Sequence, residues 1–168
     1  MGRRDDLTRR QDRLLWPDQL AVHDDTLVFR VENQVVAEWG VPLAALAEAD
    51  PPVVFRLASS GTGWRPYLDR VSLAGLDMVL SEWLMAGDLR DLDTAALTEL
   101  EKRFRPLPMP EYPLWAEADG PPTRWFAGDG VILRVDIGEW LWARGKTSRE
   151  LAAVRQALPG DWLLTEEG

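Results

Sequence analysis

Two serines and the single histidine are the first residues of this chain that could do covalent chemistry. Ser59 and Ser60 lie in a glycine-containing loop, and His23 directly precedes Asp24. A serine nucleophile needs a histidine base and a carboxylate that orients it, so these residues could form a hydrolase triad. The G-x-S-x-G turn that presents such a serine is missing from the sequence. We therefore keep a small serine hydrolase only as an alternative and expect His23 to lie exposed beside a turn.

A second candidate is the stretch 144–147, whose Gly-Lys-Thr resembles the end of a phosphate-binding loop. That loop requires another glycine five positions before Gly145, and this position is Trp140. We therefore expect no nucleotide site here. Gly145 is predicted to end a strand and Thr147 to cap a helix.

Three aspartates, Asp88, Asp91 and Asp93, lie close together between two predicted helices. A calcium loop that began at Asp91 would place Ala95 and Ala96 where an oxygen ligand and a glycine are required. We interpret these residues as helix caps or as part of an acidic patch that meets a partner. Because the chain has no cysteine and one histidine, thiolate and two-histidine metal sites are excluded. We expect no metal site.

Tryptophan is unusually frequent, with nine residues in the chain. Trp64 and Trp115 lie in stretches flanked by glycine or proline, which makes them candidates for an exposed aromatic anchor. Five others lie inside periodic segments and are predicted to be core residues. These five are Trp39, Trp83, Trp125, Trp140 and Trp142.

The charge is strongly acidic and uneven along the chain. The net charge is −9. Residues 17–50, with seven acidic and one basic residue, and residues 69–120, with eleven and five, contribute −6 each, and the rest of the chain contributes +3. Such a balance argues against nucleic-acid binding, which needs a basic surface. It favours capture of a basic protein, although a solvated surface without a partner stays open. The predicted partner contacts are Asp24, Asp25, Glu48, Trp64, Asp88, Asp91, Asp93 and Trp115.

Length and hydropathy indicate one globular domain over residues 1–168. No apolar run approaches the length of a membrane span, and the charged N-terminus lacks the apolar stretch of a signal peptide. We expect a cytoplasmic protein that contacts no membrane and is a monomer or a weak dimer.

The first half of the chain mixes helical and strand periodicity. Leucines at helical spacing predict a loosely attached N-terminal helix within residues 1–16. Alternation over 26–31 and 34–39 predicts a hairpin with a tight turn between these runs. Pro42 begins a short helical stretch, and 53–57 alternates again.

Three helices are expected, at about 72–86, 92–104 and 148–158. Between the last two, an Asp-Gly turn separates alternating runs in a C-terminal meander, and residues 161–164 could return as an edge strand. The predicted class is therefore α+β, with a mostly antiparallel sheet made of the N-terminal hairpin and the meander. In the first helix, Asp77 and Glu82 are expected to lie off the apolar stripe. That stripe comprises Leu73, Leu76, Leu80, Trp83 and Leu84.

Several short segments follow one another along the chain in an order typical of one family. They are Leu27-Val28-Phe29 leading into Glu32-Asn33-Gln34, then Trp39-Gly40, Asp50-Pro51-Pro52-Val53, the helix from Leu73 to Met85, and Gly128-Asp129-Gly130 leading to Trp140-Leu141-Trp142. Over residues 13–158 the chain resembles the SUKH superfamily. Members of that superfamily include bacterial immunity proteins of polymorphic toxin systems and fungal regulators of cell-wall synthesis.

The resemblance implies an α+β fold without catalytic centre or cofactor, and a function in protein binding, often by occluding a nuclease toxin. Nuclease toxins are basic because they bind phosphates, so acidic side chains suit their inhibitor. We therefore expect an immunity protein that neutralises a basic toxin domain. An intracellular regulator or scaffold without a toxin is the alternative within the same binding class.

Overall fold

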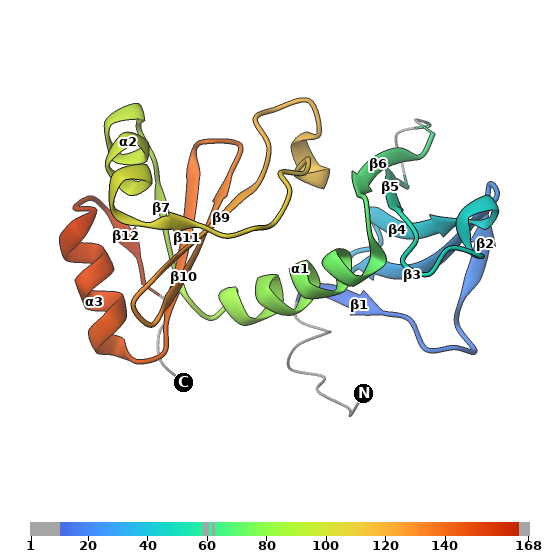
Figure 1. The fold of residues 1–168 in the computed structure, drawn as a ribbon, viewed down its shortest axis with the longest axis horizontal. Helices are drawn as coiled ribbons and strands as arrows, with labels where there is room; N and C mark the ends of the chain where they lie inside the picture. The colour runs from blue at the N-terminus through green and yellow to red at the C-terminus, as the bar shows by residue number, and fades with distance from the viewer. Residues whose placement is uncertain (1–10, 59–60, 62, 165–168) are drawn as a thin grey trace. The chain divides into compact units, whose positions relative to one another are not determined.

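The computed structural model describes residues 11–58, 61 and 63–164 (Figure 1). Its helices and two antiparallel sheets confirm the α+β class. The chain divides into two compact units, Met1–Trp83 (unit 1) and Leu84–Gly168 (unit 2), and each is described by itself. The expectation of one domain stays a prediction.

Unit 1 contains an antiparallel sheet in the order β1-β3-β4-β5-β6, with β2 also paired to β3 (Figure 1). Its strands are β1 Asp12–Leu14, β2 Ala21–His23, β3 Thr26–Glu32, β4 Ala37–Pro42, β5 Val53–Leu57 and β6 Arg65–Leu68. The predicted N-terminal helix is wrong over 12–14, where the chain pairs with β3. The rest of that prediction, up to residue 10, lies outside the described residues. Pairing with a neighbouring strand overrides a weak local helical period.

The predicted β3–β4 hairpin is present, but its turn is longer than expected. β4 begins at Ala37, so residues 34–36 belong to the turn and not to the strand. Val35 has a φ of 60°, which is unfavourable for a β-branched residue. The carboxylate of Glu32 accepts the N–H of Gln34 at 2.7 Å, which stabilises this wider turn.

The core of unit 1 is built around aromatic rings. Trp39 and Phe55 on adjacent strands are almost fully buried. Tyr67 meets both rings edge-on, at centroid distances of 6.1 Å and 5.9 Å. Edge-to-face contacts of this kind stabilise a core beyond the area they bury.

Helix α1, Val71–Leu84, follows β6 and confirms the first predicted helix. Asp50 holds its start, because its carboxylate accepts the N–H of Ser72 at 2.9 Å. The predicted orientation of the helix is wrong: Asp77 and Glu82 are 1% exposed, whereas Leu76 is 47% exposed. The buried side of α1 is therefore partly polar.

Unit 2 contains the second antiparallel sheet, in the order β12-β7-β11-β10-β9-β8 (Figure 1). Its strands are β7 Asp88–Asp91, β8 Arg105–Pro106, β9 Arg124–Gly128, β10 Val131–Asp136, β11 Trp140–Gly145 and β12 Trp162–Leu163. The helices are α2 Thr94–Arg103 and α3 Ser148–Ala157, with short 3-10 turns at η2 Leu43–Ala45 in unit 1 and η3 Trp115–Glu117 in unit 2. The edge strand predicted at the C-terminal end is confirmed as β12. β7 was not predicted.

Helices α2 and α3 pack on one face of this sheet. Leu100 of α2 and Val154 of α3 share a buried cluster with Leu133 and Leu141 of the central strands. On β11 the side chains alternate, so Trp140 lies on the opposite face and is 38% exposed. The prediction of a core position for Trp140 is therefore wrong, whereas Trp39 and Trp125 are buried as expected.

The local signals around α3 are confirmed. Gly145 ends β11, and Thr147 forms a capping box in which its backbone N–H donates to Glu150 at 2.8 Å. The Gly-Lys-Thr sequence is thus a strand end followed by a helix cap.

Leu141→Ala should lower the free energy of unfolding of unit 2 by about 3 kcal/mol, because it leaves a cavity among fully buried side chains. Leu163→Ala is the matched control, since Leu163 is 66% exposed and should change stability very little. Urea unfolding of the two variants measures the difference. Equal stabilities would contradict the packing described for this sheet.

Candidate functional site

The predicted contact residues divide between the two units. Asp24, Asp25, Glu48 and Trp64 lie in unit 1, and the other four lie in unit 2. Backbone and side-chain contacts connect the first group, which makes unit 1 the stronger candidate.

The tight turn between β2 and β3 carries the first two carboxylates. His23 pairs with Thr26, so Asp24 and Asp25 form a two-residue hairpin turn. Their φ values are 44° and 58°, a left-handed conformation that aspartate tolerates better than most residues. Both side chains are exposed. The backbone of the turn therefore holds two adjacent carboxylates at the end of a hairpin.

The short turn η2 lies beside this hairpin, at the same end of the sheet (Figure 1). The N–H of Leu43 donates to the carbonyl of Asp25 at 2.8 Å. The N–H of Leu46 donates to the carbonyl of Leu43, and the N–H of Glu48 donates to that of Ala45. Glu48 therefore lies just after η2, where it is exposed. A third carboxylate thus belongs to the same region.

Large apolar side chains are exposed in the same segments. Val22 is 55%, Leu43 38% and Leu46 46% exposed. We call this region the tip surface. It comprises Val22, Asp24, Asp25, Leu43, Leu46 and Glu48. A surface of apolar groups beside charged ones has the composition of a protein-binding patch.

Arg56 supports the tip surface from β5. Its guanidinium lies 2.5 Å from a carboxylate oxygen of Asp24 and 2.9 Å from one of Glu38. It also lies over the ring of Trp64, 4.7 Å from the centroid, and the indole N–H donates to the carbonyl of His23 at 3.2 Å. Trp64 is therefore half-buried and supports the hairpin instead of projecting as an exposed anchor.

His23 does not pair with Asp24. Its Nδ1 atom lies 3.2 Å from Oε2 of Glu38, while Asp24 is held by Arg56. The pairing that the hydrolase alternative required is thus absent, and the proposed nucleophiles Ser59 and Ser60 lie outside the described residues.

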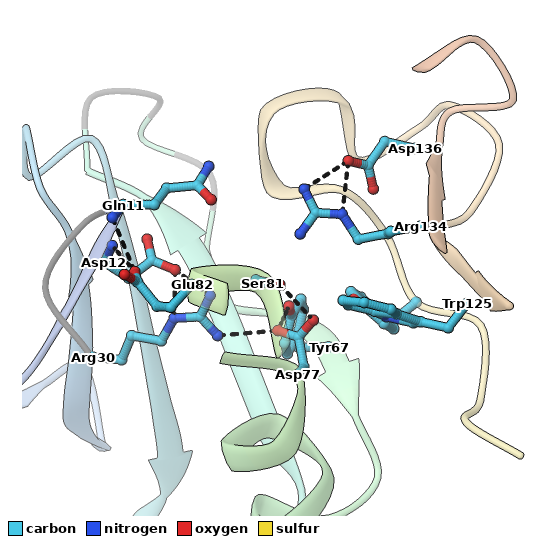
Figure 2. Close-up of polar contacts among 11 residues, drawn as sticks. Gln11, Asp12, Arg30, Tyr67, Asp77, Ser81, Glu82, Trp125, Arg134 and Asp136 are labelled. Atoms are coloured by element: carbon cyan, nitrogen blue, oxygen red, sulfur yellow. Dashed lines mark hydrogen bonds and ion pairs between the residues drawn. The ribbon is translucent and has the colours of Figure 1, made fainter. Parts of the chain in front are cut away.

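A buried charge cluster lies in unit 1, centred on Arg30 (Figure 2). Nε of Arg30 donates to Asp12 at 2.8 Å, and Nη1 donates to Asp77 at 3.2 Å. The hydroxyl of Tyr67 donates to the same oxygen of Asp77 at 2.7 Å. The guanidinium also lies over the ring of Trp39, 4.3 Å from its centroid. These contacts join β1, β3, β4, β6 and α1.

Glu82 of α1 binds the start of β1. Its Oε1 atom accepts the backbone N–H groups of Gln11 and Asp12 at 2.9 Å and 2.8 Å (Figure 2). This contact explains why Glu82 is buried: it satisfies two donors of an edge strand.

Burial dominates the electrostatics of this cluster. It raises the pKa of Asp12 above its ordinary value of 3.8, although Arg30 opposes the shift. Within the described residues, Oδ1 of Asp12 has no hydrogen-bond partner. Burial alone would lower the pKa of Arg30, but the nearby carboxylates, Asp12 first, raise it, so the guanidinium stays charged. Because these side chains are inaccessible, we assign the cluster a structural role.

The candidates in unit 2 have separate environments. Asp88 is 3% exposed and pairs with Arg155 at 3.1 Å, so it lies in the interior and not on the surface. Asp93 accepts the N–H of Ala96 at 2.7 Å, which confirms the helix-cap interpretation. Asp91 is exposed, and Trp115 is half-buried in η3. The structure therefore forms no common patch from these four residues.

The sequence analysis missed a second ion pair on a strand of unit 2. Arg134 and Asp136 share one face of β10, with Nε of Arg134 3.0 Å from the carboxylate of Asp136 (Figure 2). The hydroxyl of Thr123 donates to the same carboxylate at 2.8 Å. The guanidinium lies 5.6 Å and 5.8 Å from the ring centroids of Trp125 and Trp142. The spacing of two residues between opposite charges on a strand was the available signal.

The described residues contain no group of three or more His, Cys, Asp or Glu that could hold a metal ion. None of the helices in this part of the chain combines the length and the apolar character needed to cross a bilayer. No family model, curated protein or solved structure matches the chain.

Arg30→Met should lower the free energy of unfolding by about 3–5 kcal/mol, because it leaves Asp12 and Asp77 buried without their counter-charge. Arg13→Met on the exposed side of β1 is the matched control and should have little effect. Chemical unfolding monitored by tryptophan fluorescence compares the two. A tolerated Arg30→Met variant would contradict the role of Arg30 as the central cation.

The raised pKa of Asp12 predicts a pH dependence. A carboxyl whose pKa is higher in the folded state stabilises the fold fully below its ordinary value of 3.8 and loses that contribution as the pH rises through the folded-state pKa. We therefore compare the free energies of unfolding of the wild type and the Asp12→Asn variant. The wild type minus variant difference should be largest near pH 3 and should decline towards pH 7. A difference that grows with pH would show that the ion pair with Arg30 outweighs burial.

Proposed function

We propose that this chain is a protein-binding domain that binds a basic polypeptide through the tip surface of unit 1. The observation that carries the proposal is the grouping of three exposed carboxylates with three exposed apolar side chains around one hydrogen-bonded pair of turns. Apolar contacts supply most of the binding energy of such an interface, and charge complementarity selects the partner.

The carboxylates of this region are paired with cations only in part. Arg30 is the only basic residue in 17–50, and it is buried within its own ion pairs. Arg56 contacts the turn and is shared between Asp24 and Glu38. Asp25 and Glu48 therefore present charge that favours approach of a positively charged partner.

Within this class we propose an immunity protein that neutralises a nuclease-type toxin. Support comes from the resemblance to the SUKH superfamily and from the α+β fold, which agrees with it. A nuclease binds phosphates through arginine and lysine side chains. Carboxylates held on a rigid hairpin can occupy the places of these phosphates and keep the substrate out.

The test is a tagged chain expressed in its native host and purified at about 50 mM salt, where exposed charges are weakly screened. Co-purifying proteins are identified, purified and titrated in defined pairs. We expect a basic partner whose association slows as salt increases.

Asp24→Asn, Asp25→Asn and Glu48→Gln combined should slow association with that partner at least about tenfold. The matched control, Glu117→Gln, Glu139→Gln and Asp161→Asn, removes the same charge from exposed positions of unit 2. A partner that binds the tip variant as fast and as tightly as the wild type would refute the tip surface as the binding site.

A further inference from the structure

Unit 2 contains an open pocket of about 230 Å³ that the proposed function does not use. It lies between strand β9 and the proline-rich segment that follows α2. Leu107, Met109 and Trp125 contribute apolar walls, and Glu101, Glu111 and Arg124 contribute charged groups.

We propose that this pocket receives one arginine side chain of the basic partner. This inference rests on the proposed function, to which it adds a second contact with a defined chemistry. Arginine is among the residues that most often act as energetic anchors of protein interfaces.

The size of the pocket favours a single side chain. Sites for small molecules and cofactors usually enclose roughly 300–1,000 Å³, which is more than this pocket offers. A long side chain with an apolar stem and a polar end matches walls that are apolar inside and charged at the rim.

The charged residues of the pocket carry one more negative than positive charge. Glu101 and Glu111 contribute two negative charges, and Arg124 contributes one positive charge. Nη1 of Arg124 lies 2.6 Å from Oε1 of Glu101, whereas no ion pair among the described residues involves the exposed Glu111. An incoming guanidinium could pair with Glu111 and would leave the pocket neutral.

The pocket already accommodates one guanidinium. Arg124 lies over the ring of Phe126, 5.6 Å from its centroid, while it pairs with Glu101. A planar, weakly hydrated cation is stabilised by an aromatic face and a carboxylate together, and arginine meets this requirement better than lysine. The same kind of surroundings can stabilise a second guanidinium.

The walls are also held in place. The N–H of Leu107 donates to the carbonyl of Trp125 at 2.9 Å, and Tyr112 forms a bridge with Thr123. The indole N–H of Trp125 donates to the hydroxyl of Tyr112 at 2.8 Å. Because both ends of the proline-rich segment are bonded to the region of β9, the pocket needs little ordering before it binds.

The test is a titration of the full chain with a short alanine–glycine peptide that carries one central arginine. Identical peptides with citrulline, which is neutral and of similar shape, and with lysine serve as comparisons. The indole N–H signal of Trp125 in a ¹H–¹⁵N spectrum, assigned with Trp125→Phe, reports on the pocket. We expect the arginine peptide to shift this signal and to bind at least about fivefold more tightly than the citrulline or lysine peptide.

Glu111→Gln should weaken binding of the arginine peptide about fivefold, and Glu117→Gln, a control that is also exposed, should leave it unchanged. Equal binding of citrulline or lysine, an unmoved Trp125 signal or an unaffected Glu111→Gln variant would each overturn the inference. The tip variant should bind the peptide as the wild type does. Failure of the wild type to bind the arginine peptide would thus refute the pocket inference alone. Unchanged binding of the protein partner to the tip variant would refute the proposed function.

Discussion

Unit 1 depends on the need to compensate one buried guanidinium. Arg30 is 4% exposed, and an isolated charge at this depth would strongly destabilise the fold. Its carboxylate partners come from β1 and α1, and its planar guanidinium lies over the ring of Trp39 in β4. The cation therefore explains why Asp77 of α1 faces inward, and its bond to Asp12 acts together with Glu82 to hold the short edge strand β1.

The tip surface lies at the end of that sheet and is held in place by its strands. Its two central carboxylates occupy a two-residue turn between β2 and β3, and β3 is also paired with β4, so little conformational entropy remains to be lost on binding. Arg56 of β5 connects the turn to the rest of the unit, because its guanidinium pairs with Asp24 and lies over the ring of Trp64. Such a construction suits recognition of another macromolecule, and the rigid pocket of unit 2 follows the same principle with proline as its stiffening residue.

Local signals in the sequence predicted unit 2 well. The Asp-Gly turn before β10, the capping box of α3 and the strand alternation around Leu141 depend on neighbours within a few residues. Strand β7 was missed because Asp88-Leu89-Arg90-Asp91 has a polar composition. Distant groups compensate two of its charges: Asp88 pairs with Arg155, and Arg90 donates to the carbonyls of Leu158 and Pro159. For the same reason Asp88 could not be distinguished from a surface carboxylate.

The sequence by itself determined the α+β class, the three helices, the acidic balance and the carboxylates of the tip. Only the tertiary structure decided that Asp77 and Glu82 face inward, that residues 12–14 form a strand, and that His23 pairs with Glu38. The periodicity of α1 ranks side chains by hydropathy, and hydropathy counts a carboxylate as a surface group. The buried cation Arg30 reverses that preference for Asp77, and the backbone N–H groups of Gln11 and Asp12 reverse it for Glu82. These partners lie far from α1 in the sequence.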